Sequence, residues 1–262
     1  ARMALGPRAP EAAVEALREE MHLNDSYIVQ YGYWISGILQ GDFGDSIVTR
    51  RPVAEDISSY VPATLELAII TAMLVIVFGI ALGVVSTKYS GKWLDGIIRT
   101  LSYFGICAPA FLWAVLAMLL FAYVIPVLPI SGRLSAGFSP PDTITGMYTV
   151  DFLLQGNFAG FWDALKHLIL PAVSLSFAGI SQAARITRSS MVENLDKPYA
   201  YAERAYGIPE NKILRKYLLK PSLNSTISVM ALDIAGIFGG AFLVEQIFGY
   251  PGLANYGLTA ML

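Results

Sequence analysis

The feature that most constrains this chain is a pair of long uncharged apolar runs. Leu67 to Ser86 contains 20 residues without a charge, and Thr100 to Gly132 contains 33. Crossing the hydrocarbon core of a bilayer takes about 20 apolar residues in a helix. Two weaker runs follow, His167 to Ala184 and Pro221 to Gln246. The sequence therefore predicts an all-α polytopic membrane protein with four visible spans.

The second run is interrupted by Pro109, Pro126 and Pro129. We expect one long helix that ends near Val124, followed by a loop. Cys107 lies in the same run, and a lone thiol cannot form an internal disulfide. We interpret it as a small buried hydrophobe.

Composition agrees with a membrane protein, because only 15% of the residues are charged, against about 25% in soluble domains. Lys and Arg then predict the orientation. Of the 18 Lys and Arg residues, three lie in 87–99 and eight in 185–220, whereas only two lie in 125–166. Short cytoplasmic loops collect Lys and Arg. We expect 87–99 and 185–220 on the cytoplasmic side, and 1–60 and 125–166 outside. The net charge of −2, without a basic stripe, argues against nucleic-acid binding.

The predicted organisation has two parts, an extracytoplasmic segment over 1–60 and a transmembrane domain over 61–262. Apolar residues recur at helical spacing over 10–21, and a second amphipathic stretch covers 28–40. Its aromatic residues suit either a membrane interface or packing within a small extramembrane subdomain. They are Tyr31, Tyr33 and Trp34.

A structured polar element interrupts the apolar pattern at YAYAERAYGIPENKI, residues 199–213. We predict a short helix over Tyr199–Tyr206, a break at Gly207 and a second helix opening at Ile208-Pro209, since Gly suits a helix end and Pro a helix start. Such an element suits docking into a groove of a cytoplasmic partner. The alternative is a solvated charged loop.

This element resembles the cytoplasmic coupling loop, the EAA loop, of ABC-importer permeases. The small residues Ala202 and Ala205, then Gly207 and Ile208, match its core. The match departs at the triplet that gives the loop its name, because positions 201–203 read Tyr-Ala-Glu instead of Glu-Ala-Ala.

The rest of the chain is similar to the dipeptide, oligopeptide and nickel branch of that family. The resemblance implies a core of six helices, hence one helix before Ala1 and one after Leu262. The similar segments are GDFGDSI (41–47), VPATLELAI (61–69), ISGR (130–133), ARITRSSMVENL (184–195) and FLVEQIFGYPGLANYGLTAM (242–261).

The resemblance implies a permease of a bacterial or archaeal cytoplasmic membrane that forms half of a translocation path for di- or oligopeptides. Nickel, a metal chelate or another small solute is the alternative cargo. The implied partners are a second, homologous permease, two cytoplasmic ATPase subunits and an extracytoplasmic solute-binding protein.

The chain itself is not expected to be an enzyme or to hold a cofactor, so that ATP and Mg²⁺ would bind the partner ATPases. Its only Gly-Lys pair, Gly91-Lys92, lacks the remaining residues of a phosphate-binding loop. No HExxH or GxSxG motif supports the alternative of a membrane enzyme. A channel would leave the docking element without a role.

The expected coupling contacts lie in the loop and follow from the resemblance. We expect Gly207→Asp to abolish coupled ATPase activity while part of the assembly survives. The set consists of Tyr199, Ala202, Glu203, Ala205, Tyr206, Gly207 and Ile208.

The expected path or gate residues include intramembrane acids, which are costly and usually face a bundle interior. Asp233 is near mid-span and either lines the path or pairs with the partner permease. Glu66 and Glu245 lie near outer span ends, where each either acts at the mouth or reaches interfacial water. The gate set is Asp233, Glu245, Phe248, Pro251 and Gly252.

The glycines of the fourth run and the two histidines of the chain also allow structural interpretations. The glycines 236, 239 and 240 suit close helix packing or a hinge. His22 and His167 are far apart in sequence and form no ligand cluster with Cys107, so we expect no metal site.

Overall fold

The computed structural model describes residues 5, 6, 8–46 and 48–261. Within these ranges it contains helices and one isolated antiparallel bridge, between Asp45 and Pro52. The chain divides into two compact units, Ala1–Val61 with Tyr256–Leu262, and Pro62–Asn255. Ile47, in the matched segment 41–47, lies outside the described residues.

The first unit contains α2 (Glu11–Glu20) and α3 (Tyr27–Leu39), together with the first turns of α4 (Val53–Lys88) and the last turns of α12 (Leu253–Met261). The helices predicted over 10–21 and 28–40 are confirmed. None of the residues of α3 is buried within the chain, and its four aromatic residues are more than half exposed. This exposure favours the membrane-interface reading of Tyr31 and Trp34, while Tyr33 stacks on His22.

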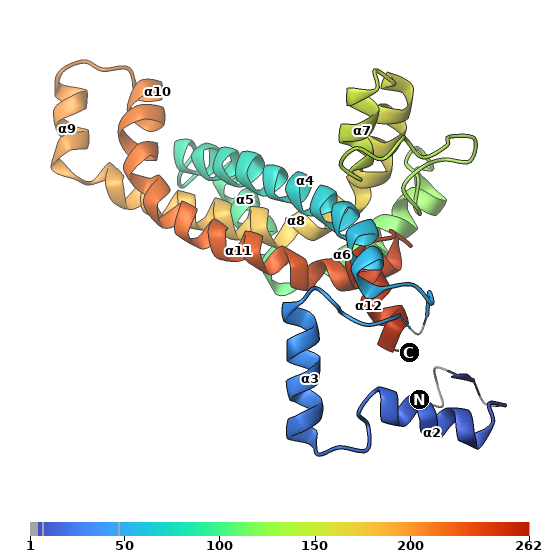
Figure 1. Cartoon of the computed structure of the whole chain (residues 1–262). Helices are drawn as coiled ribbons and strands as arrows, with labels where there is room; N and C mark the ends of the chain where they lie inside the picture. Colours follow the sequence, from blue (N-terminus) through green and yellow to red (C-terminus); the bar gives the residue numbers. More distant parts are fainter. Residues whose placement is uncertain (1–4, 7, 47, 262) are drawn as a thin grey trace. The chain divides into compact units, whose positions relative to one another are not determined.

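The second unit is built on long apolar helices (Figure 1). α4 (Val53–Lys88), α8 (Phe158–Leu195) and the stretch Glu210–Ile247 are each long and apolar enough to cross a membrane. That last stretch comprises α10 (Glu210–Lys212), a π-helical segment (Ile213–Leu218) and α11 (Leu219–Ile247). A fourth candidate span is a bent pair of helices.

The bent pair corrects the prediction of one long helix in the second apolar run. α5 (Trp93–Cys107) and α6 (Ala110–Leu119) meet at 107°, and a π-helical turn then carries the chain to Val124. Pro109 has no amide hydrogen and disfavours helical geometry in the preceding residue, and Ala108 is extended at φ −94° and ψ 132°. The predicted end near Val124 is confirmed. Cys107, expected to be buried, is exposed at the break.

Of the three glycines predicted to pack closely, Gly240 does so, since an added Cβ would lie 3.0 Å from Leu175 Cδ1, but the tightest helix contacts are at other glycines. A Cβ added at Gly79, Gly83 or Gly105 would overlap Ala183, Thr187 or Ser181 of α8. Small residues let helix backbones approach in this way. By contrast, a Cβ on Gly236 or Gly239 would meet no atom within 4 Å, so the packing reading of those two glycines is wrong within this chain.

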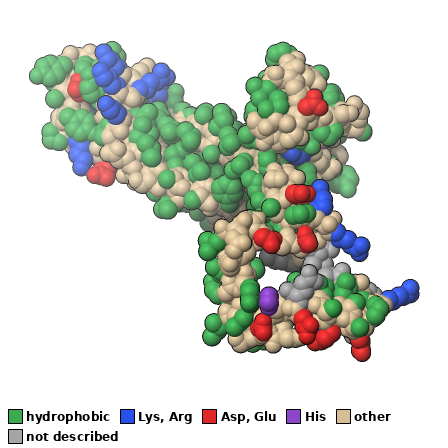
Figure 2. Space-filling view, in the orientation of Figure 1, with side chains coloured by type: hydrophobic (Ala, Val, Ile, Leu, Met, Phe, Trp, Pro, Cys, Tyr) green, Lys and Arg blue, Asp and Glu red, His purple; other side chains and the backbone are tan. Residues whose placement is uncertain are grey.

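The two ends of α8 carry different elements. α7 (Tyr148–Leu154) precedes α8 at one end, and α9 (Pro198–Ala205) follows it at the other (Figure 1). Arg188 of α8 bonds Asp95 of α5, which brings 87–99 to the α9 end. Hydrophobic side chains cover the middle of these helices, and Lys and Arg gather around α9 and α10 (Figure 2).

Candidate functional site

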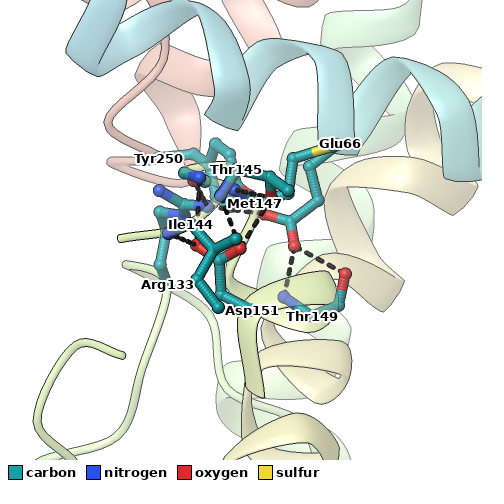
Figure 3. Close-up of polar contacts among 9 residues, drawn as sticks. Glu66, Arg133, Ile144, Thr145, Met147, Thr149, Asp151 and Tyr250 are labelled. Atoms are coloured by element: carbon teal, nitrogen blue, oxygen red, sulfur yellow. Dashed lines mark hydrogen bonds and ion pairs between the residues drawn. The ribbon is translucent and has the colours of Figure 1, made fainter. Parts of the chain in front are cut away.

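A buried cluster of polar side chains lies at the α7 end of the second unit (Figure 3). Glu66 of α4 is its centre. Arg133 Nη2 lies 2.6 Å from one carboxylate oxygen, to which the Tyr250 hydroxyl also donates at 3.1 Å. The amide and hydroxyl of Thr149 donate to the other oxygen at 2.6 and 2.7 Å. This Glu66 cluster joins four segments of the chain.

The charges of the Glu66 cluster are shielded from solvent. The side chains of Arg133 and Glu66 are 8% and 2% exposed. The Arg133 guanidinium carbon lies 3.5 Å from the centre of the Tyr148 ring, and Arg133 Nη2 donates a hydrogen bond to the carbonyl of Gly146. Burial, followed by the charge of Glu66, raises the pKa of the Tyr250 hydroxyl well above its usual range, so it remains a donor. The reading of Glu66 as reaching interfacial water is therefore wrong.

Asp151 organises the loop that precedes α7. Its carboxylate accepts hydrogen bonds from the Thr145 amide at 2.8 Å, the Thr145 hydroxyl at 2.7 Å and the Gly146 amide at 2.9 Å. Burial opposes ionisation, but these bonds and one from the Ile144 amide outweigh it and lower the pKa of Asp151 below 3.8. Asp151 is therefore a charged acceptor at neutral pH.

We expect acid to release this loop. Because the folded pKa of Asp151 is below its unfolded value of 3.8, its stabilising contribution is complete above that value and is lost as pH falls through the folded pKa. Hydrogen-exchange protection factors of the 144–146 amides should stay constant from about pH 7 to 5 and fall below about pH 4. In Asp151→Asn the protection should already be low at pH 7, without an acid step. An unchanged acid step in that variant would assign the effect to another group.

Glu245 of α11 forms a second buried carboxylate site. The Thr64 hydroxyl donates to Oε1 at 2.6 Å, and the amides of Ala254 and Asn255 donate to Oε2 at 3.0 and 3.1 Å. A Cβ on Gly252 would overlap this carboxylate, which explains the glycine there. Glu245 is fully buried, so its reading as reaching interfacial water is wrong as well.

Of the predicted gate residues, Glu245 and Gly252 lie in contact at this site, whereas Asp233 lies elsewhere. Phe248 is buried in the apolar core beside this site, and its carbonyl accepts from the Gly132 amide at 3.0 Å. Pro251 is exposed. Asp233 is not part of this group: it lines a cavity of about 420 Å³ together with residues such as Gln182 and Gly236. Its Oδ2 is buried and has no hydrogen-bond partner among the described residues.

The α9 end has its own ion pair, between the buried carboxylate of Asp95 and the half-buried guanidinium of Arg188. Arg188 Nε and Nη2 lie 2.6 and 2.8 Å from the two oxygens of Asp95. The Ser86 hydroxyl and the Gly91 amide also donate to Asp95, at 2.5 and 3.1 Å. This bidentate pair fixes the α4–α5 turn to α8, close to where α8 leads into the loop.

The predicted helix, break and helix over 199–213 are confirmed. α9 begins with Pro198 at its first turn and ends at Ala205. Gly207 has φ +74°, its amide donates to the Arg204 carbonyl at 2.9 Å, and the Ile208 amide donates to the Glu203 carbonyl at 3.1 Å. These two bonds form a Schellman end, which favours glycine because a side chain strains this backbone.

The loop has an anchored face and an open face. Ile208 and the fully buried Ala200 pack on an apolar cluster with members such as Met191 and Leu218. The Tyr206 side chain is 84% exposed. Of the remaining predicted contacts, Glu203 is half-buried and four are exposed: Tyr199, Ala202, Ala205 and Gly207.

Sequence reasoning missed several residues of these sites. Ala200 is in the loop but was not selected, because burial of one alanine in a short helix has no periodic signal. Arg133 is one of two Lys or Arg residues in 125–166 and lies in the matched segment 130–133, which could have pointed to it. Asp151, Thr149 and Tyr250 gave no signal, since their partners are distant in sequence.

Metal ligation finds no support in the described part of the chain, where no group of three or more His, Cys, Asp or Glu could hold an ion. His167 contacts the Ser131 carbonyl at 2.9 Å and the Ser135 hydroxyl at 3.2 Å. His22 belongs to the other unit.

Comparison with known proteins gives a consistent result. The family model described as "Binding-protein-dependent transport system inner membrane component" matches residues 75–262. The probable D,D-dipeptide transport system permease protein DdpB of Escherichia coli (strain K12) is 38% identical over 261 residues, covering 100% of this chain and 77% of that protein. The dipeptide transport system permease protein DppB of Alkalihalophilus pseudofirmus is 35% identical, covering 98% and 77%. The glutathione transport system permease protein GsiC of Salmonella typhi is 32% identical, covering 97% and 74%.

Proposed function

Because the chain belongs to the family of binding-protein-dependent transport system inner membrane components, we propose that it is a permease subunit of an ATP-driven importer of short peptides. The relatives named above carry dipeptides or glutathione, which favours peptides over the alternative of nickel or a metal chelate. The observation that carries the proposal is the exposed, rigidly anchored α9–Gly207 element.

The α9–Gly207 element is suited to transmit motion. Its apolar face is fixed to the ends of α8 and α11, and the Asp95–Arg188 pair ties the same end of α8 to the α4–α5 turn. A rigid element that is docked in a partner moves as one body when the partner closes. The open face offers Tyr199, Tyr206 and the backbone at Gly207 to a cytoplasmic ATPase subunit, with Ala202 and Ala205 allowing close approach.

This assignment implies a separate role for each subunit of the importer. Two ATPase subunits would bind ATP and Mg²⁺ and hydrolyse the nucleotide, and this chain would have no catalytic role. A second permease would complete the path, and a solute-binding protein would deliver peptide on the outer side. The α9 end would face the cytoplasm and the Glu66 cluster the outside of a bacterial or archaeal cytoplasmic membrane, since Lys and Arg gather at the α9 end.

The candidate path residue with the strongest physical argument is Asp233. An unpaired buried carboxylate oxygen in a spanning helix is costly unless a ligand or partner satisfies it. Glu245 and Gly252 would instead hold the loop after α11 closed over the end of the path.

The experiment that tests the proposal is purification of the intact complex through a tag on this chain, followed by reconstitution in liposomes. We expect uptake of a radiolabelled dipeptide that requires ATP and the binding protein, and no comparable uptake of ⁶³Ni²⁺. Absence of ATP-dependent peptide uptake from a complex that hydrolyses ATP would refute the peptide assignment.

A further inference from the structure

Two cavities follow one another along the same faces of α5 and α8. The first, of about 420 Å³, is the Asp233 cavity; the second, of about 350 Å³, lies nearer the α9 end. On α8 the lining passes from Gly179 and Gln182 to Arg185 and Ser189, which are spaced three or four residues apart and so share one helix face. Gln182 of the first cavity accepts a hydrogen bond at 2.8 Å from Arg185 of the second. We refer to the two cavities together as the α5–α8 groove.

The α5–α8 groove has opposite charges at its two ends. Asp233 is the only charged residue that lines the first cavity, and it has no hydrogen bond or ion pair with another described residue. The second cavity is lined by three arginines and no acid. Arg188 is neutralised by Asp95, Arg185 bonds only the neutral Gln182, and Arg99 is exposed. The positive charge open to a ligand therefore comes from Arg99 and Arg185.

The separation of the two ends matches a short peptide. Gln182, which lines the first cavity with Asp233, and Ser189, which lines the second with Arg99 and Arg185, are seven residues apart on α8, a rise of about 10 Å. An extended chain of four residues spans about 14 Å, and one of two residues about 7 Å. The extended lengths of peptides of two to four residues thus bracket this separation.

We propose that the α5–α8 groove binds short peptides as zwitterions, with the N-terminal ammonium on Asp233 and the C-terminal carboxylate on Arg99 and Arg185. This inference rests on the proposed function and names the part of the substrate that this chain recognises. Because the arginines lie nearer the α9 end, the peptide passes with its carboxylate leading. Both contacts are to main-chain termini, so side chains of different peptides are tolerated.

Thiol labelling of the intact complex tests the charge separation, and Cys107→Ser removes the native thiol first. Gly236→Cys reports on the acidic end, where an added Cβ meets no atom within 4 Å, and Ser189→Cys reports on the basic end. Between a cationic and an anionic methanethiosulfonate, we expect about a tenfold preference for the cation at position 236 and for the anion at position 189. Equal rates with both reagents at both positions would overturn the proposal.

Charge-removing variants assign the preference to the named residues. Asp233→Asn should abolish the cation preference at position 236, and Arg185→Gln should reduce the anion preference at position 189. Asp142→Asn and Arg215→Gln remove one negative and one positive charge from exposed positions that do not line the groove, and should change neither preference. If Gly236→Cys fails to assemble, Ala178→Cys lines the same cavity and replaces it.

Protection by peptide identifies the ligand termini. A dipeptide with free termini should slow labelling at both positions. Its N-acetylated form should no longer protect position 236, and its C-amidated form should no longer protect position 189. If the unlabelled wild-type complex imports no peptide, the proposed function fails. If it imports peptide but blocked and free dipeptides protect equally, only the groove assignment fails.

Discussion

Gly207→Asp is expected to lower substrate-stimulated ATPase activity of the assembled importer at least tenfold. The physical reason is the open face of the loop. Gly207 is exposed, and an added Cβ would meet no atom of this chain within 4 Å, so the chain by itself has room for a side chain. Placing a carboxylate in an interface that is desolvated on docking costs several kcal/mol unless it is paired. ATPase activity with and without binding protein and peptide measures the effect.

The control for this change separates charge from backbone strain. At φ +74° any L side chain is disfavoured by about 1–2 kcal/mol, although Asn and Asp tolerate this region better than most residues. Gly207→Asn has the size of Asp without the charge and should retain most of the stimulation. Equal activity of the Asp variant and the wild type would contradict docking at this position. Equal loss in the Asn and Asp variants would assign the effect to backbone geometry instead.

Arg133→Met is expected to destabilise the second unit by about 3–5 kcal/mol, because it leaves the Glu66 carboxylate buried without its cation. Met keeps most of the apolar stem of Arg, so the loss reports mainly on the charge. For a protein of this size the thermal midpoint should fall by roughly 6–20 °C. Thermal unfolding of the purified chain in one detergent, at one pH, measures the change.

A double substitution tests whether the effect belongs to the pair. Glu66→Gln together with Arg133→Met should cost less than the sum of the two single changes, since residues of one buried network are coupled. Lys166→Met removes an exposed cation at the same end of the unit and should shift the midpoint by no more than about 2 °C. Additive effects of the two single changes would show that Glu66 and Arg133 act independently.

The candidate sites divide into residues that the sequence could point to and residues that it could not. The Gly207 break follows from local chemistry, since glycine, proline and helical spacing act over a few neighbouring positions. Asp233 stood out because a carboxylate is costly in an apolar span. The partners of Glu66 are out of reach of such reasoning: Arg133, Thr149 and Tyr250 lie 67, 83 and 184 positions away.

The residue pattern alone predicts a helical membrane chain with a structured polar element at one end. Uncharged runs of span length and the clustering of Lys and Arg are local properties of the chain, and lipid permits few other structures for them. The angle of the bend at Pro109 and the glycines that pack helices closely became known from the folded arrangement of the helices. The same arrangement gives Glu66 and Glu245 hydrogen-bond partners within the chain but leaves Asp233 Oδ2 without one among the described residues. The reason is that the burial and pairing of a polar group depend on which distant segments contact it, and the residues next to it in sequence do not predict those segments.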